Sequence, residues 1–325
     1  MIRYLYGTDP HAKGTSPRTR TDDFPDTVKR KLAEYLRVGQ ERDVDFYLFG
    51  GDLFDSPYAT PQFVHDIGAI LQEGLGGKPF FYVLGNHDMS GYNPDTIRQT
   101  AYGLLLRFLP NAVELTREPK AYTFNGETIY LSGVHSYTML DRDTEDGHRS
   151  RDYVVGRLDH PSIHVVHGYL SPTPVLEDIP HTVVSDMAHT EATVTLTGHE
   201  HTGFPVMETK GGLVYNPGAM SRVFASRREM ERMPKIVYGE IDGGVPRLEP
   251  IPLASAVKGE AVFDVEAIHT RNKQRAILEQ SQQDLKATLA TLDIKHVNVA
   301  SILEGLRGAT DKDVFEESKK RILKR

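Results

Sequence analysis

The chain contains no cysteine among its 325 residues. That absence excludes disulfide bonds, thiolate nucleophiles, cysteine-based zinc fingers and iron–sulfur clusters together. A metal site in this protein would have to be built from His, Asp, Glu and Asn side chains. The 14 histidines are numerous enough to make such a site worth seeking.

Long hydrophobic runs are missing as well. No stretch approaches the ~18 to 20 apolar residues that a membrane helix needs, and residues 1–9 lack the charged and apolar regions of a signal peptide. We therefore expect a cytoplasmic protein without a membrane partner. Hydrophobic residues make up 39% and charged residues 26% of the chain, which is typical of a globular protein and excludes a disordered or collagen-like one.

Acidic residues outnumber basic ones, and the formal net charge of −7, taken alone, disfavours a nucleic-acid partner. The excess is unevenly placed, because residues 258–325 hold 13 basic and 11 acidic side chains. The negative charge therefore belongs to the first part of the chain. Its meaning depends on whether the carboxylates there hold cations, which would turn an acidic site into a positive centre for phosphate.

Short apolar runs alternate with amphipathic helical patterns up to about residue 250, which predicts an α/β fold. Strands are predicted at residues 3–7, 45–49, 80–84, 122–124, 128–132, 163–166, 192–196, 213–215 and 236–241. Helices are predicted to begin at Asp26, Thr60 and Asn93, whose side chains can cap a helix N-terminus.

The pattern changes beyond residue 250. Leucines at positions 278, 285, 289 and 292 share one face of a predicted helix, and Asp311 can cap a last helix. We therefore predict a catalytic domain at residues 1–250 and a helical C-terminal extension at residues 251–325. The extension would either bind a partner or pack on the first domain.

Five short segments rich in His, Asp and Asn each follow a predicted strand. They are residues 9–11, 51–55, 85–88, 166–168 and 198–201. In open α/β sheets, ligands gather beyond the carboxyl ends of strands, where polar side chains from several strands can converge. One such segment alone is more often a turn or a hydrogen-bonded residue. Five together, with donors suited to Mn²⁺, Fe²⁺ or Zn²⁺, favour a metal site.

The order D-x-H, G-D-x-x-D, G-N-H-D, H-G and G-H-x-H resembles the motif series of the calcineurin-like metallophosphoesterases, over roughly residues 1–220. Within that superfamily the chain is most similar to the SbcD-type subunit of a DNA repair exonuclease, in a short phage-like form. This narrower resemblance depends on residues 51–57, residues 215–219 and the helical extension. It implies a β-sandwich flanked by helices, in the cytoplasm of a bacterial or phage-infected cell.

The resemblance also implies two divalent ions, with Mn²⁺ expected and Mg²⁺, Fe²⁺ or Zn²⁺ as alternatives. The implied ligands are Asp9, His11 and His201 for one ion, Asn86, His167 and His199 for the other, and Asp52 as the bridge between them. Such a pair of cations can clamp the attacking and leaving oxygens of a phosphate ester. Asp88 and Glu200 lie inside the motifs but are not expected to be ligands.

His87 would, by the same resemblance, contact the scissile phosphate or protonate the leaving oxygen. Asp55 could accept a hydrogen bond from His87 and orient it, or it could simply cap a turn. Four further residues are candidate substrate contacts: Lys13, Arg18, Arg20 and His135. For the three basic residues, a solvated loop is an equally good interpretation.

The resemblance implies a nuclease that cleaves phosphodiesters in DNA, together with an SbcC-type coiled-coil ATPase and as a possible homodimer. The alternative is a small-molecule phosphodiesterase, for example one acting on cyclic nucleotides. A phosphatase is less favoured because Ser56 stands where phosphoprotein phosphatases usually carry an arginine. A binding scaffold without activity is the least favoured, because all the motif positions are filled.

Overall fold

The structure is a computed structural model that describes residues 1–264 and, beyond them, residues 266, 270, 273, 280, 281, 316 and 320. Met1–Asp264 form one compact unit. The unit continues past the boundary expected near residue 250, because Val262 and Phe263 are buried in it. The leucines of the predicted C-terminal stripe and Asp311 lie outside the described residues.

The first of two large sheets has the strand order β14-β13-β1-β2-β3-β4. Its strands are β1 (Ile2–Gly7), β2 (Phe46–Phe49), β3 (Phe80–Tyr82), β4 (Ala112–Glu114), β13 (Lys235–Asp242) and β14 (Val245–Pro252). Strands β1 to β4 run parallel, whereas β13 is antiparallel to β1 and β14 is antiparallel to β13.

The second sheet has the order β11-β12-β10-β7-β6-β5. Its strands are β5 (Lys120–Phe124), β6 (Glu127–Val134), β7 (Ser162–Gly168), β10 (Val194–His199), β11 (Phe204–Glu208) and β12 (Leu213–Asn216). The four central strands are parallel and the two edge strands are antiparallel. A separate pair joins β8 (Leu170–Ser171) to β9 (Thr182–Val183).

The two sheets pack against each other through alternate residues of their strands. In β1, Tyr4 and Tyr6 face a core shared with Ile163 and Val165 of β7. Leu5 points to the opposite side, into a core shared with the helices. Because both faces of β1 are covered, its residues form a nearly continuous apolar run rather than an alternating one. The predicted α/β fold with a sandwich of sheets flanked by helices is confirmed.

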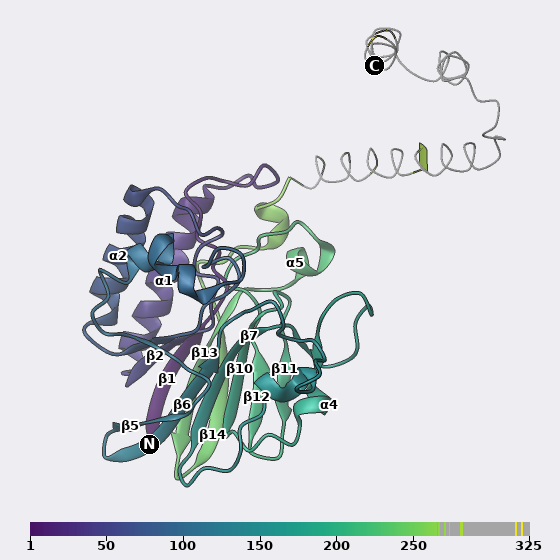
Figure 1. Cartoon of the computed structure of the whole chain (residues 1–325). Coiled ribbons are helices and arrows are strands. Elements are labelled where there is room, and N and C mark those ends of the chain that lie inside the picture. Colours follow the sequence, from purple (N-terminus) through teal and green to yellow (C-terminus); the bar gives the residue numbers. More distant parts are fainter. Residues whose placement is uncertain are drawn as a thin grey trace, which may run out of the picture. The chain divides into compact units, whose positions relative to one another are not determined.

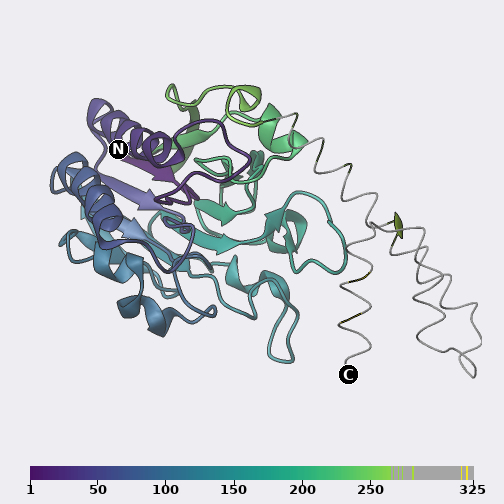
Figure 2. The same cartoon turned by 90° about the horizontal axis from the view of Figure 1, so that it is seen from above.

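Helices α1 (Phe24–Glu41), α2 (Pro61–Leu75) and α3 (Ala101–Leu105) cover the outer face of the first sheet (Figures 1 and 2). The short helix α4 (Val184–Met187) packs in the core on the outer face of the second sheet. Short helices η1 (Pro94–Gln99), η2 (Arg149–Asp152), α5 (Arg227–Glu231) and η3 (Gly259–Ala261) lie in the connections.

Two helix predictions need correction. Helix α1 begins at Phe24 and is capped by Asp23, which accepts a hydrogen bond from the Asp26 amide, so the cap is not Asp26. The helix expected from Asn93 is split into η1 and α3 at Thr100. This residue has an extended backbone, and its side chain caps α3 by accepting from the Gly103 amide. The cap at Thr60 is present as predicted, with Phe63 as its donor.

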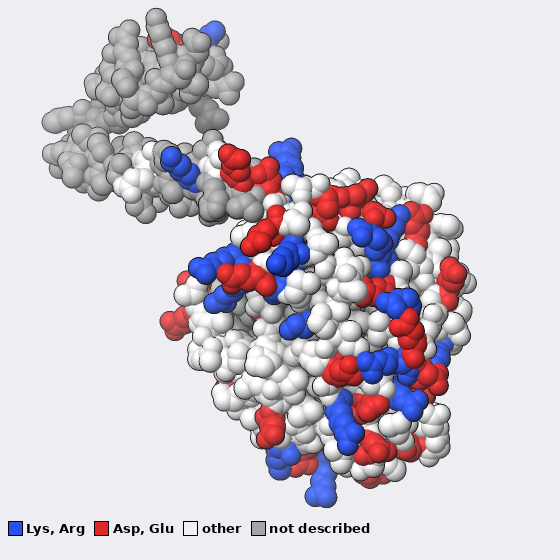
Figure 3. Space-filling view, turned by 180° about the vertical axis from the view of Figure 1, so that it is seen from behind, with Lys and Arg blue, Asp and Glu red and all other residues white. Residues whose placement is uncertain are grey.

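The surface of the compact unit mixes both signs of charge. On the face in Figure 3, acidic and basic side chains are interspersed, without a broad field of one sign. Within the described part of the chain, no helix has both the length and the apolar character that a membrane span requires.

Candidate metal centre

The five polar segments meet where strands of the two sheets end. The Nδ1 atom of His167, at the end of β7, lies 2.6 Å from the carbonyl oxygen of Gly50, which follows β2. The backbone nitrogen of His199, at the end of β10, lies 3.1 Å from Oδ2 of Asp9, which follows β1. Hydrogen bonds between the sheets therefore bring together the side chains that the sequence places at separate strand ends.

The backbone at this edge is bent sharply. Asp9, His11, Asp52 and His199 have φ angles of 53°, 48°, 51° and 77°, a region that non-glycine residues seldom adopt. Strained conformations of this kind persist where the surrounding structure enforces them, and they concentrate at functional sites. Gly51 has φ 97°, and a Cβ atom there would lie 2.5 Å from His167 Nδ1, so only glycine fits.

The first candidate ligand group consists of Asp9, His11 and His201, whose ligand atoms all lie within 4.8 Å of one another. His11 Nε2 is 3.0 Å from His201 Nε2 and 3.7 Å from Asp9 Oδ1. Two imidazole nitrogens and a buried carboxylate that face a common point are suitable donors for a divalent transition metal.

The second group consists of Asp52, His167 and His199. His167 Nε2 lies 3.3 Å from Asp52 Oδ2, and His11 Nε2 of the first group lies 3.7 Å from the same oxygen. Asp52 therefore stands between the two groups, as a bridging carboxylate should. Asn86 adds a neutral oxygen, since its Oδ1 is 3.0 Å from His199 Nδ1.

His167 shows that the donors fit a metal. A carbonyl oxygen can only accept, so the contact with Gly50 requires a proton on Nδ1 of His167. The lone pair of the neutral ring is then on Nε2, which is buried and has no hydrogen-bond partner. Metal-binding histidines commonly donate their second ring N–H to a backbone carbonyl in this way.

The pKa values of the cluster also favour metal binding. Burial opposes ionisation of Asp9, but the His11 contact and the charge of His167 outweigh it and lower the Asp9 pKa to about 2. Burial lowers the pKa of His199 to about 4 and that of His201 to about 3, so both rings are neutral and keep a lone pair. For His167, the charge of Asp52 overcomes burial and raises the pKa to about 10. A divalent ion would take the place of that proton.

Asp88 is a supporting residue whose role sequence reasoning did not find. It is fully buried and accepts hydrogen bonds from the backbone amides of Asp52, Phe54 and Gly85 at 2.8 to 3.2 Å. Burial and the charge of Asp52 raise its pKa to about 7. Asp88 thus ties the loop of Asp52 to the loop of Asn86. The only signal in the sequence is its place in the G-N-H-D motif.

His87 borders the cluster and is half-buried. Its ring forms a third group with His11 and Asp52, and its backbone nitrogen lies 2.8 Å from Asp52 Oδ1. Its Nδ1 is 2.8 Å from the main-chain carbonyl of Asp55. The predicted orienting contact therefore exists, but through the backbone of Asp55. The Asp55 carboxylate instead pairs with Lys13 and lies 3.7 Å from His11 Nδ1.

The candidate substrate contacts occupy different environments. Lys13 is exposed and bound to Asp55 at 2.8 Å, and Arg18 is exposed without a hydrogen bond or ion pair among the described residues. Arg20 is buried and forms two contacts with Asp22, so it is not free to meet a phosphate backbone. Both ring nitrogens of His135 already have partners, the Leu84 amide at Nδ1 and Glu114 at Nε2, at 2.9 and 2.8 Å.

Glu200, expected only as a spacer between two ligands, closes the turn after β10. Its carboxylate accepts from the amides of Thr202 and Gly203 and from the Thr202 hydroxyl. The turn places both neighbours of Glu200 in the sequence, His199 and His201, at the cluster.

Residues 219–222, which follow β12, form hydrogen bonds with the backbone of the loops that carry Asp9 and His201. The amides of Ala219, Met220 and Ser221 bond to the carbonyls of His201, Thr8 and Asp9. The four carbonyls of residues 219–222 accept from three buried or nearly buried cations, Arg20, Lys31 and Arg232. The backbone that carries Asp9 and His201 is therefore held by a densely hydrogen-bonded segment.

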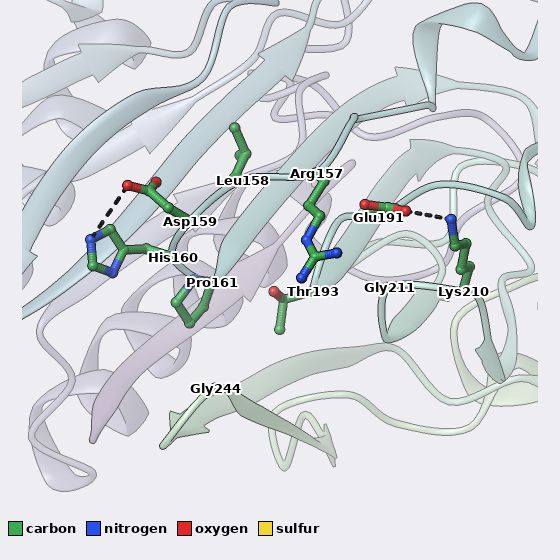
Figure 4. A pocket seen from close by; sticks show the side chains of 10 residues that line it. All are labelled: Arg157, Leu158, Asp159, His160, Pro161, Glu191, Thr193, Lys210, Gly211 and Gly244. Atoms are coloured by element: carbon green, nitrogen blue, oxygen red, sulfur yellow. Dashed lines mark hydrogen bonds and ion pairs between the residues drawn. The ribbon is translucent and has the colours of Figure 1, made fainter.

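Two other features complete the surroundings. A cavity of about 520 Å³ opens over the cluster and is lined by Asp52, His87, His199 and His201 among others. A separate hollow of about 410 Å³ is lined by Arg157, Lys210 and Glu191 (Figure 4). Lys210 is paired with Glu191 there, and among the described residues no group of metal-binding side chains lies at this hollow.

Two groups of His and Asp side chains, with the Asp52 carboxylate of the second within 3.7 Å of His11 of the first, define this edge as a candidate dinuclear metal centre of a phosphoesterase. Residues 6–203 match the family described as calcineurin-like phosphoesterase, more than half of the chain, and the protein belongs to this family. Metallophosphoesterases are hydrolases that use two divalent metals, and the two ligand groups supply places for both.

Solved structures resemble this chain at low sequence identity. A protein of Thermus thermophilus is 12% identical with a TM-score of 0.44, covering 77% of this chain and 98% of that one. A dimetal phosphatase from Danio rerio is 11% identical with a TM-score of 0.49, covering 77% of this chain and 96% of that one. Comparison with curated proteins finds no match.

Proposed function

We propose that the protein is a two-metal phosphodiesterase that cleaves DNA. The observation that carries the diester assignment is the charge of the cavity over the metal centre. None of the described residues that line it is a lysine or an arginine, while two of them are Glu200 and Glu229. A phosphate monoester carries up to two negative charges and a diester carries one, so a site without basic side chains is better suited to the diester.

Ser56 supports the same assignment. It occupies the position where a phosphatase would carry an arginine, and its hydroxyl accepts from the Tyr58 amide, so it serves a local turn. The choice of DNA as the diester depends on the similarity of residues 51–57 and 215–219 to SbcD-type nucleases.

The residues divide the chemistry as follows. Bound at the two groups, divalent ions would supply positive charge for the phosphate and activate a water. Asp52 would hold both ions, and its Oδ1 fixes the His87 backbone. The Asp55 carbonyl keeps a proton on His87 Nδ1, so Nε2 is the atom that can pass a proton to the leaving oxygen.

The decisive experiment compares substrates with Mn²⁺ present: linear duplex DNA, circular single-stranded DNA, a cyclic dinucleotide and p-nitrophenyl phosphate. We expect DNA cleavage that falls by about 100-fold or more in His87→Asn, while calorimetry still detects two Mn²⁺ ions. His65→Asn is the matched control, because His65 is exposed on α2. Cleavage of the cyclic dinucleotide alone would establish the small-molecule alternative, and cleavage of the monoester alone would overturn the proposal.

The proposal includes an SbcC-type coiled-coil ATPase that binds residues 265–325, and a possible homodimer. A truncation to test this should follow Asp264 rather than residue 250, because Val262 and Phe263 belong to the compact unit. Co-purification of the ATPase with the truncated protein would contradict this part of the proposal.

A further inference from the structure

A second cavity adjoins the one over the metal centre. The first, here called the His201 cavity, contains His87, His201 and Phe224. The second, of about 320 Å³ and here called the tyrosine cavity, contains Tyr92 and Tyr137. Tyr169 and His199 line both. The two cavities therefore meet at a candidate ligand of the second ion and extend away from it.

Phe224 is placed unusually for an aromatic residue. Its ring stacks on His201, with centroids 5.8 Å apart and planes inclined by 21°, yet 63% of the residue remains exposed. A phenylalanine that served only the fold would bury more of its apolar surface. One ring face is thus fixed against a candidate metal ligand, while much of the side chain remains free beside the cavity.

The tyrosine cavity offers similar surfaces on the other side. Tyr169 meets His199 edge-on, with ring centroids 6.1 Å apart, so it separates the two cavities. Tyr92 is 49% exposed, and Tyr137 is held in place by a 2.7 Å hydrogen bond to Asp152. Aromatic rings therefore form part of the wall of each cavity, and the tyrosine cavity also contains the charged side chains of Asp141 and Arg142.

We propose that the two cavities hold the two organic groups of one phosphodiester, each with a nucleobase stacked on an aromatic side chain. This deepens the proposed function and depends on it. A diester has two substituents and a monoester only one, so paired cavities at one phosphate position match a diester. The leaving group lies in the His201 cavity, because His87 lines that cavity and is the proton donor.

Stacking of a base on an aromatic side chain typically contributes enough affinity that alanine substitution weakens binding by about five- to 100-fold. The test uses single-stranded oligonucleotides in which one nucleotide carries no base. For the unmodified protein, we expect kcat/KM at the phosphate beside the missing base to fall about tenfold relative to an intact strand. When the missing base is on the leaving side, Phe224→Ala should bring the ratio of kcat/KM for the intact and modified strands close to one. When the missing base is on the other side, Tyr92→Ala should have the same effect.

The matched control is Tyr130→Ala. Tyr130 also lies beside a histidine ring, that of His160 at 6.3 Å, but it is on β6 and lines neither cavity. It should leave the ratio at about tenfold. Equal ratios in the unmodified protein and in Phe224→Ala would overturn the stacking proposal.

A second substrate pair separates this inference from the DNA assignment. Thymidine 5′-(p-nitrophenyl phosphate) carries a base, whereas methyl p-nitrophenyl phosphate has a methyl group in its place. If DNA is not cleaved but the thymidine ester is preferred and Tyr92→Ala removes the preference, the DNA assignment fails and the cavity proposal stands. If the methyl ester is cleaved equally well, the cavity proposal fails whatever happens with DNA.

Discussion

Arg20 and Arg18 are close in the sequence, but the structure buries Arg20 and leaves Arg18 exposed, and substitution of Arg20 tests this difference. Arg20 is 8% exposed and donates to both carboxylate oxygens of Asp22, at 2.8 and 2.7 Å. A third contact, at 2.8 Å, goes to the carbonyl of Arg222, and the guanidinium also lies 4.7 Å from the ring centroid of Phe24. Arg20→Gln removes all of these at once.

The expected loss follows from burial. Removing one partner of a buried ion pair costs about 3 to 5 kcal/mol, because the other charge is left uncompensated. Asp22 is only partly buried, with 20% of its side chain exposed, and it keeps a hydrogen bond from Thr27. We therefore expect the unfolding free energy to fall by about 2 to 3 kcal/mol, at or below the lower end of that range. Urea unfolding of the full chain, followed by circular dichroism, measures it. Arg20→Lys should recover part of the loss.

Arg18→Gln is the control, because Arg18 lies two residues before Arg20 in the sequence but its side chain is exposed. Its unfolding free energy should change by less than about 0.5 kcal/mol. If Arg18 contacts the DNA backbone, this variant should instead raise KM for DNA and reduce the salt dependence of binding. An Arg20→Gln protein as stable as the unmodified one, with only KM raised, would refute the structural role of Arg20 and restore it as a substrate contact.

Two further predictions concern His164, in the central strand β7, and Gly85, in the loop after β3. Burial lowers the pKa of His164 to about 4, so between about pH 6.5 and 4 the unfolded chain binds a proton that the folded chain does not. The unfolding free energy should therefore decrease by up to about 3 kcal/mol as the pH falls through this range. His164→Gln should reduce this pH dependence, and an unchanged slope would contradict a neutral buried ring. At Gly85 a Cβ atom would lie 2.0 Å from Asp52 Oδ1, so Gly85→Ala should weaken Mn²⁺ binding at least tenfold by calorimetry. Gly156→Ala, where a Cβ meets nothing within 4 Å, should not.

The loops of the candidate metal centre stand out in the sequence because their signal is local. A turn after a strand requires Gly or Asp, but it does not require the imidazoles of His87 or His199, so these residue types stand out. The roles of Asp55 and Arg20 were less accessible, because they depend on contacts. The contact from Asp55 to His87 uses a carbonyl that every residue has, and Arg18 and Arg20 look alike until the fold buries one of them.

The errors in secondary structure have a similar origin. Apolar positions continue with helical spacing past Thr100, so periodicity alone could not show that its hydroxyl starts a new helix. Strand β14 was not predicted, since Pro246, Pro250 and Pro252 argue against a strand. They are tolerated because β14 is at the edge of its sheet and pairs only with β13.

Residues 219–222 explain why the chain keeps basic side chains in its interior. Their amides face the loops of Asp9 and His201, so their carbonyls point away from any neighbouring strand and need other donors. Lys31 supplies one at 2.8 Å, although burial and three nearby arginines push its pKa well below the ordinary value. Its hydrogen bond to Met220 helps to fix the main chain that carries the candidate ligands Asp9 and His201. The geometry of the centre therefore depends on residues that never approach the substrate.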